Sequence, residues 1–314
     1  MHTRTLWAAP AALLVAAAAP AQAPKPTFPV IHRYAAGAQG LYVNAYLVET
    51  PHGVVAVDAT LTESDSKAFR AKIDSIGKPL LAVLITHGHP DHYNGVTNLL
   101  AGQAVPPPVL ATAGVDSVIR ANDAAKEQQW KPVFGDEWPA QRTFPSRIVR
   151  DGESVTFDGA TFTVHPLGPG ESYNDSYWVL QGTRGTRRNP GTPGAAFIGD
   201  VVLNGVHAYM ADGHTAAWLA NIERVRDALS PNMTVYPGHG DPGGPEMLAW
   251  ESNYLTTYRS AVAMLARGSA TLDSTSKAAL VVRMKQFLPS DRLEMLIGMG
   301  ADPVAAELAQ SRGR

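Results

Sequence analysis

The feature that most constrains this fold is an apolar run that ends in a cluster of histidines. Residues 80–84 read Leu-Leu-Ala-Val-Leu, a continuous apolar segment with the length of a buried strand. Three histidines and an aspartate follow between His87 and His92. Helical spacing at residues 64–76 precedes the strand, so the sequence predicts an α/β arrangement with polar chemistry at the strand's carboxyl end.

The patterns on either side predict two sheets covered by helices. Strands are expected at residues 40–49, 54–57, 80–86, 109–111, 154–157, 160–164, 177–181, 195–198 and 234–236. Helices are expected at residues 64–76, 93–100, 115–129 and 218–229, and helical spacing dominates from residue 246 onward. We expect one α/β domain at residues 28–245, with a C-terminal helical extension at residues 246–314 packed on the same domain.

Two further segments are expected to be loops. Residues 130–139 are aromatic and contain proline, so they predict an irregular loop that either covers a pocket as a lid or packs its rings on its own base. Residues 182–191 carry three arginines, and they indicate a solvated hairpin loop more than an anion-binding site.

The composition sets the broad class of protein. Of the 314 residues, 45% are hydrophobic and 17% are charged, which is typical of a globular chain with ample core-forming material. The formal net charge of −2 provides no electrostatic surface for nucleic acid, so a small-molecule substrate is expected. The chain has no cysteine, which excludes disulfides and any metal site built on thiolate. Nothing in the sequence indicates an oligomeric state.

The start of the chain has the order of features found in a secretory signal peptide. A short basic segment at residues 1–4 precedes an apolar run at residues 6–19, and small residues follow. We expect cleavage after Ala21, which makes residues 1–21 the signal peptide. A membrane anchor is the alternative, but Pro10 interrupts the apolar run, which is also short for a bilayer span. The mature chain is therefore expected to be periplasmic or secreted, without stable membrane association.

The histidine cluster has the spacing of metal ligands. Alternate side chains share one face of an extended segment, so His87 and His89 can bind one ion together. Asp91 and His92 face elsewhere, and a following turn lets this pair serve a second ion nearby. Hydrogen bonding on a loop would account for one histidine, but not for three beside an aspartate. The run therefore predicts a two-metal centre.

A two-metal centre needs further ligands from other strand ends. Three acidic or imidazole side chains each follow a predicted strand beside glycine, which lets the backbone approach closely: Glu171, Asp200 and His239. Asp58 also ends a predicted strand, at residues 54–57.

Together these residues resemble a known family. Residues 87–92 are similar to the HxHxDH signature of the metallo-β-lactamase-fold hydrolases. The order of Asp58, this run and the three strand-end candidates resembles the motif series of that superfamily over about residues 40–245. The resemblance implies an α/β fold, a four-layer αββα sandwich with a C-terminal helical tail. It is highly specific for the fold and weakly specific for the substrate.

The resemblance implies a role for each residue. His87 and His89 would bind the first metal ion, and Asp200 would bridge both ions. The second ion would be bound by Asp91, His92 and His239. Asp58 would be a buried acceptor that steadies the histidine loop, and the alternative is a solvent-facing aspartate at the end of a strand.

Glu171 departs from the family pattern, because a third histidine for the first ion usually occupies this position. A glutamate oxygen can bind zinc, but it adds negative charge and hardness. With Asp91 and Asp200 it brings the ligand charge to about −3 against +4 from two divalent ions, so bound water should be less acidified than in a histidine-rich site. Zinc is expected, with manganese or iron as alternatives. Otherwise Glu171 turns away and leaves the first site open or weakly held, with His165 or His214 as a less favoured ligand.

Other residues are candidates for the substrate pocket. They are aromatic or imidazole side chains near the expected ligands or in residues 130–139: His207, Tyr209, His214, Trp130 and Trp138. Residues 212–215 are equally suited to capping the helix that follows. In the C-terminal tail, Met295, Leu296 and Met299 are expected to be packing residues.

The expected function is hydrolysis of a carbonyl-type bond through a metal-bound hydroxide, with Asp91 relaying the proton to the leaving group. An aspartate in the bridging position, where β-lactam-opening members have cysteine, resembles glyoxalase-II, lactonases and related ester or thioester hydrolases. The predicted export argues against cytoplasmic glutathione thioesters and favours lactones, esters or β-lactam-like compounds.

Two alternative functions remain. The first is a β-lactamase-like enzyme that opens β-lactam rings, against which the missing cysteine argues. The second is a non-hydrolytic metal-binding or redox protein on the same fold. A di-iron, oxygen-reducing relative would usually be fused to a flavin domain, of which this sequence shows no sign.

Overall fold

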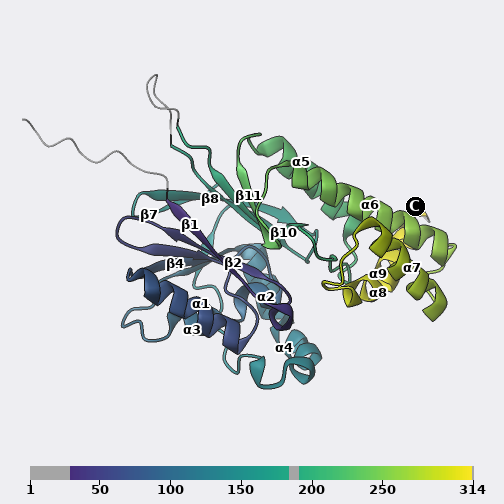
Figure 1. Cartoon of the computed structure of the whole chain (residues 1–314), viewed down its shortest axis with the longest axis horizontal. Coiled ribbons are helices and arrows are strands. Elements are labelled where there is room, and N and C mark those ends of the chain that lie inside the picture. Colours follow the sequence, from purple (N-terminus) through teal and green to yellow (C-terminus); the bar gives the residue numbers. More distant parts are fainter. Residues whose placement is uncertain (1–28, 184–190, 313–314) are drawn as a thin grey trace, which may run out of the picture.

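Two β-sheets packed face to face form the centre of the molecule, and helices cover the outer face of each sheet (Figure 1). The computed structural model describes residues 29–183 and 191–312. The layers follow the order helix, sheet, sheet, helix. The expected α/β class and four-layer sandwich with C-terminal helices are therefore confirmed.

The first sheet has strand order β1-β2-β3-β4-β5-β6. Its strands are β1 Val30–Ala35, β2 Asn44–Glu49, β3 Val54–Val57, β4 Leu80–Leu84, β5 Val109–Thr112 and β6 Arg147–Val149. Strands β1 to β3 run antiparallel, and β3 to β6 run parallel. The carboxyl ends of β3 and β4 therefore lie at one edge of the sheet, where the histidine segment begins.

The second sheet has strand order β11-β10-β9-β8-β7. Its strands are β7 Ser154–Phe157, β8 Ala160–Gly168, β9 Asp175–Leu180, β10 Ala195–Leu203 and β11 Thr234–His239. Only the β10 and β11 pair is parallel among these. Both strands extend further than their apolar patterns predict, so Asp200 lies within β10 and His239 is the last residue of β11.

The central strands are buried on both faces, which explains their continuous apolar sequence. In β4, Ala82 and Leu84 face the second sheet, whereas Val83 packs under the helices. Phe162 and Trp178 of the second sheet fill the space between the sheets and are both 0% exposed. This core fixes the register of β4 and therefore the starting point of the histidine segment.

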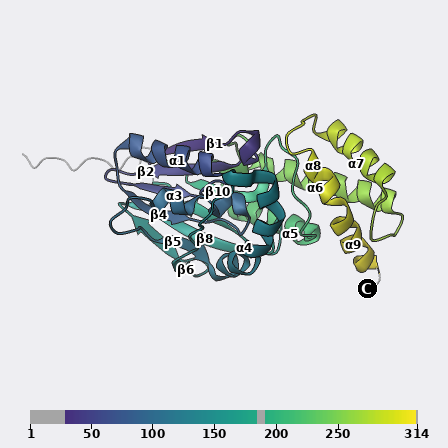
Figure 2. The ribbon, with the colours of Figure 1, turned by 90° about the horizontal axis from the view of Figure 1, so that it is seen from below.

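Helices α1, α3 and α4 cover the first sheet, and α5 and α6 cover the second (Figures 1 and 2). The helices are α1 Glu63–Ile76, α2 Pro90–Tyr93, α3 Val96–Leu100, α4 Ala113–Phe134, α5 Thr215–Ala228, α6 Glu246–Ala266, α7 Ser274–Phe287, α8 Met295–Met299 and α9 Ala301–Arg312. The described ranges also contain 3-10 turns at Ala38–Gly40 and Gly135–Glu137. No helix in the described ranges is long and apolar enough to cross a membrane.

The prediction of an irregular segment at residues 130–139 is wrong in its first half. Helix α4 continues to Phe134, although Pro132 lies inside it. The exposed proline removes one backbone donor, but Lys131 pairs with Glu127 at 2.8 Å and Gly135 N–H caps the helix on the Lys131 carbonyl. The Phe134 ring also packs near Trp138, with 6.3 Å between ring centroids. The helix therefore keeps its last turn although Pro132 gives up one backbone hydrogen bond.

The C-terminal helices share a hydrophobic core with the second sheet. Leu248, Tyr254 and Tyr258 of α6 pack in one cluster with Val201 of β10 and Trp218 of α5. In both views the helices after α6 lie at one end of the molecule (Figures 1 and 2). The predicted signal peptide and most of the 182–191 loop lie outside the described residues.

Candidate metal centre

The histidine segment leaves β4 in an extended conformation and then enters a short helix. His87 forms an isolated antiparallel bridge to β9, and His89 keeps an extended backbone with φ −82° and ψ 145°. Pro90 starts α2, because its fixed φ suits the first helical position. The extended half directs His87 and His89 to one group of side chains, and the helical turn directs Asp91 and His92 to another.

The first group brings Glu171 to the two leading histidines. Ligand atoms of His87, His89 and Glu171 lie within 4.8 Å of one another. His89 Nδ1 is 2.9 Å and His87 Nε2 is 3.4 Å from Glu171 Oε2. Glu171 is 2% exposed, so it points into the protein beside the histidines rather than turning away.

The second group contains Asp91, His92 and His239, again with ligand atoms within 4.8 Å of one another. His239 Nε2 is 3.2 Å and His92 Nε2 is 3.7 Å from Asp91 Oδ2. The last residue of β11 therefore meets the histidine segment across the gap between the sheets.

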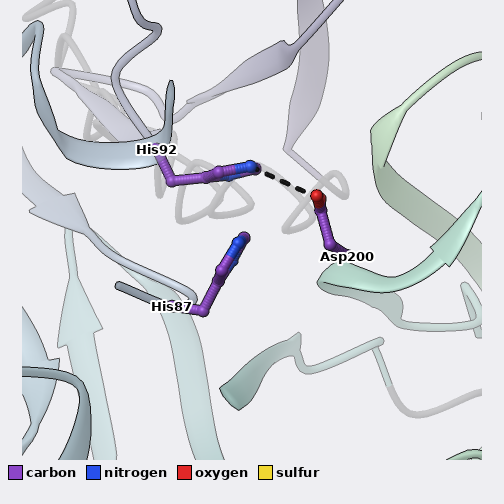
Figure 3. Close-up of side chains that lie close together, drawn as sticks. All are labelled: His87, His92 and Asp200. Atoms are coloured by element: carbon purple, nitrogen blue, oxygen red, sulfur yellow. Dashed lines mark ion pairs between the residues drawn. The ribbon is translucent and has the colours of Figure 1, made fainter. Parts of the chain in front are cut away.

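Asp200 joins the two groups. It forms a third group with His87 and His92, and Figure 3 shows these side chains converging on one space. Its Oδ1 is 3.4 Å from His92 Nε2, and its Oδ2 is 3.2 Å from His239 Nε2. Asp200 therefore has a donor neighbour in each group, His87 in the first and His92 in the second.

Two glycines permit the close approach of Asp200. A Cβ atom at Gly238 would lie 1.8 Å from Asp200 Oδ1, and one at Gly199 would lie 2.7 Å from Thr86 Oγ1. Gly199 also has a φ of 52°, in the left-handed region that favours glycine. A side chain at either position would therefore displace the Asp200 carboxylate or the histidine segment.

The inward-facing atoms of this cluster lack well-aligned hydrogen bonds, which favours a bound cation. Within the described residues, these buried atoms make no well-aligned hydrogen bond, although they lie close to one another: His87 Nε2, His92 Nε2, both Glu171 carboxylate oxygens and Asp200 Oδ1. Each unpaired buried group costs about 1–3 kcal/mol. Divalent metal ions bind imidazole nitrogen and carboxylate oxygen, so the residues present fit such ions.

Asp58 lies under the histidine segment, as a buried acceptor would. It is 3% exposed, and it accepts hydrogen bonds from Thr86 N at 2.9 Å and from Thr86 Oγ1 at 2.8 Å. Its Oδ2 is also 2.9 Å from His92 Nδ1. This contact fixes the His92 ring and leaves Nε2 directed at the centre.

Two other imidazoles are tethered in the same way. His239 Nδ1 is 2.9 Å from the Leu41 carbonyl oxygen. His89 Nε2 is 3.3 Å from Asp212 Oδ2. The sequence suggested only a helix-capping role for the region of Asp212, because its approach to His89 depends on a contact 123 positions away in the chain.

Burial and neighbouring charges shift the pKa values of the clustered side chains in opposite directions. Burial lowers the pKa of His87 well below its ordinary value, and the adjacent His92 adds to this effect, so His87 stays neutral. Burial also disfavours the charged form of His92. The neighbouring carboxylates, Asp200 above all, outweigh burial and raise the pKa of His92 well above its ordinary value. Burial raises the pKa of Glu171 to about 8. Divalent cations would offset this concentration of buried carboxylates.

The cluster lies at an open cleft with a volume of about 560 Å³, which includes the space at its opening. The cluster residues that line this cleft are His89, Asp91, Glu171, Asp200 and His239. Of the expected pocket residues, three line its wall: Trp130, Trp138 and Tyr209. His207 does not, because it is 0% exposed and its two ring nitrogens lie 2.9 Å from Tyr254 Oη and 2.9 Å from the Ser290 carbonyl oxygen. His207 therefore ties the segment after β10 to the C-terminal helices.

His214 and His165 also lie apart from the metal groups. The His214 ring contacts the Tyr173 ring at a centroid distance of 4.9 Å, and His214 does not line the cleft. His165 stacks on Tyr177 at 4.9 Å. Neither histidine takes the place of Glu171 beside the first two ligands.

The sequence prediction missed part of the cleft wall. Lys126 and Phe134 line it together with Trp130, and the spacing of four residues places all three on one face of α4. Ending the expected helix before Trp130 hid this signal. Leu296 also lines the cleft, and Met295 is 53% exposed rather than packed.

Comparisons with known proteins identify the same fold. Residues 38–173 match the model of the metallo-beta-lactamase superfamily. The chain is similar to the solved structure of a beta-lactamase domain protein from Burkholderia ambifaria, with 20% identity, a TM-score of 0.64, and coverage of 92% of this chain and 88% of that chain. It is also similar to a metallo-beta-lactamase family protein from Thermus thermophilus, with 19% identity, a TM-score of 0.58, and coverage of 91% of this chain and 93% of that chain.

A curated relative matches over a shorter region. It is the uncharacterized protein YobT of Bacillus subtilis (strain 168), which is 30% identical over 115 residues, 36% of this chain. The match spans 48% of that relative, so it covers about half of the relative's length.

Proposed function

Because the chain is a metallo-β-lactamase-fold protein whose residues 38–173 match that superfamily, we propose that it is a dinuclear metal-dependent hydrolase of a carbonyl-type bond. Its substrate would be an ester, a lactone or a thioester. The observation that carries this proposal is the set of interlocking donor groups, with buried atoms that make no well-aligned hydrogen bond, at an open cleft.

The three donor groups would hold two divalent ions, with Asp200 shared between them. When bound, such ions polarise a carbonyl and lower the pKa of water. Four imidazoles in the cluster suit zinc, and three carboxylates make manganese or iron the alternatives. Zinc is our proposal, because imidazoles outnumber carboxylates.

Asp91 would move the proton of the reaction. It lines the cleft, is 9% exposed, and has Oδ2 3.2 Å from His239 Nε2. Burial favours its neutral form, but the charges of His92 and His239 outweigh burial and lower the pKa of Asp91. The carboxylate therefore begins ionised and can accept a proton from water before passing it to the leaving oxygen.

The proposed site of action is outside the cytoplasm. The order of basic, apolar and small residues at positions 1–23 supports export. This location favours esters and lactones met outside the cell over glutathione thioesters.

A substrate panel on the purified mature protein tests the proposed function. Ester, lactone, thioester and chromogenic β-lactam substrates are assayed before chelation, after chelation, and after zinc or manganese is restored. We expect ester or lactone turnover that chelation removes and metal restores. Asp200→Asn should lose this turnover, whereas Asp227→Asn makes the same change at a side chain 78% exposed and should retain it. Turnover that survives complete metal removal, or turnover of the β-lactam alone, would contradict the proposal.

A further inference from the structure

The cleft has an apolar wall that metal binding does not require. Three aromatic rings from α4 and the segment after it line the cleft: Trp130, Phe134 and Trp138. Five leucines from four separate parts of the chain line it as well: Leu41, Leu61, Leu203, Leu293 and Leu296. The metal ligands could be held without these side chains, so the wall indicates what kind of molecule the cleft accepts.

The two halves of this wall come from different parts of the fold. The aromatic half belongs to α4, which covers the first sheet. Leu293 lies just before α8 and Leu296 lies in its first turn, among the C-terminal helices, and both are less than a tenth exposed. A ligand in the cleft therefore meets apolar side chains from both parts. Such a slot favours a long or flat apolar group over a sugar or another polar molecule.

One cation lies in this apolar wall. Lys126 is the only lysine or arginine among the described residues that line the cleft. Its Nζ donates to Tyr209 Oη at 3.3 Å and lies 5.0 Å from the centroid of the Tyr209 ring. Within the part of the chain that the structure describes, Lys126 forms no ion pair. An ammonium group has three N–H donors, so two remain for a ligand.

We propose that the cleft binds an amphiphilic carboxylate, and that the substrate is an ester or lactone of a hydrophobic carboxylic acid. The apolar arm would lie against the α4 rings and against Leu293 and Leu296, and Lys126 would hold the carboxylate that hydrolysis releases. Water adds across the acyl C–O bond, with its hydroxyl going to the acyl carbon and its proton to the leaving oxygen. The acid then gives its own proton to solvent. The identity of this substrate rests on the proposed function, whereas binding of the carboxylate does not.

Isothermal titration calorimetry of the mature protein as purified tests the site with butanoate, decanoate and decanol. Each methylene buried against the wall should tighten binding by about two- to fourfold, so decanoate should bind at least tenfold more tightly than butanoate. Lys126→Met should weaken decanoate binding about tenfold and leave decanol binding unchanged. Trp130→Ala should weaken decanoate and decanol alike, and Phe134→Ala gives a second change of the same kind on α4.

Matched controls remove the same kinds of group at exposed positions outside the cleft. Lys67→Met removes a charge from α1 at a side chain 65% exposed, and Val133→Ala shortens a side chain of α4 that is 69% exposed. Both variants should bind decanoate as the wild type does. Equal affinity for butanoate and decanoate, or equal loss in Lys126→Met and Lys67→Met, would overturn the proposed site.

Hydrolysis of p-nitrophenyl butanoate and decanoate separates this inference from the proposed function. A higher kcat/KM for the decanoate ester, reduced by Trp130→Ala, supports both. Decanoate binding with the expected variant pattern but without hydrolysis of either ester would refute the hydrolase and retain the amphiphile site. Equal hydrolysis of both esters without decanoate binding would retain the hydrolase and refute the amphiphile site.

Discussion

Replacing Glu251 with glutamine should remove a pH-dependent loss of stability. Glu251 lies on α6, is 0% exposed, and accepts a hydrogen bond at Oε2 from Leu203 N–H at 3.0 Å. Its Oε1 has no hydrogen-bond partner in the described residues. Burial raises the pKa of Glu251 to about 8 from an ordinary value of 4.5, although the Leu203 N–H acts against this.

The sign and size of the effect follow from these two pKa values. Between about pH 4.5 and 8 the carboxyl is protonated in the folded protein and ionised in the unfolded chain, so the folded state binds more protons. The free energy of unfolding therefore falls as pH rises through this window. The difference of about 3.5 between the pKa values corresponds to a loss of up to about 5 kcal/mol, at about 1.4 kcal/mol for each pKa unit.

Urea unfolding between pH 5 and pH 9, at one fixed metal concentration, measures this loss. The free energy of unfolding of Glu251→Gln should fall less steeply with pH than that of the wild type, and the variant should be several kcal/mol more stable at pH 8.5. Glu246→Gln makes the same change at an exposed position of α6 and should follow the wild type. If Glu251→Gln and the wild type lose stability equally across this window, the carboxyl of Glu251 is not protonated in the folded protein.

Three other predictions concern the metal centre and export. Glu171→Ala should lose mainly one metal ion, and Glu171→His should restore it with a preference for zinc; unchanged metal content in Glu171→Ala would show that this residue is no ligand. Asp58→Ala leaves the Thr86 donors and His92 Nδ1 without their acceptor, so it should lower stability by about 3 kcal/mol or more, and an unchanged melting temperature would contradict this role. Mass spectrometry should find a mature chain that begins near Gln22, and an intact Met1 on a cytoplasmic protein would refute export.

The central layers could be predicted because their physical signals are local. β4 is apolar at every position because both of its faces are buried. The sequence up to Leu84 therefore predicts a core strand. The spacing of His87 and His89 and the turn at Pro90 separate two sets of ligands within six residues. The glycines beside the expected ligands predict a close approach of the backbone. The structure shows such an approach at Gly238, where a Cβ atom would lie 1.8 Å from Asp200 Oδ1.

The remaining features depend on contacts between distant segments. Asp212 follows β10 and His89 follows β4, and they meet only once the two sheets are packed together, so no local pattern shows their contact. The end of α4 was misread because Pro132 predicts a break, whereas packing around Phe134 keeps the helix intact. Leu296 packs in the core as expected, but its place on the cleft wall could not be predicted because it depends on how the C-terminal helices fold back.

Metal content per chain tests the central claim most directly. Elemental analysis of the dialysed protein should find about two divalent ions in the wild type. His52→Ala, which alters an imidazole whose side chain is 85% exposed, should keep the same content. His92→Ala and His239→Ala should each retain about one ion or fewer with normal circular dichroism, because each removes a nitrogen from the second group. Metal content that is equal in all four proteins, or a wild-type protein that is fully active without metal, would contradict a two-metal centre at this site.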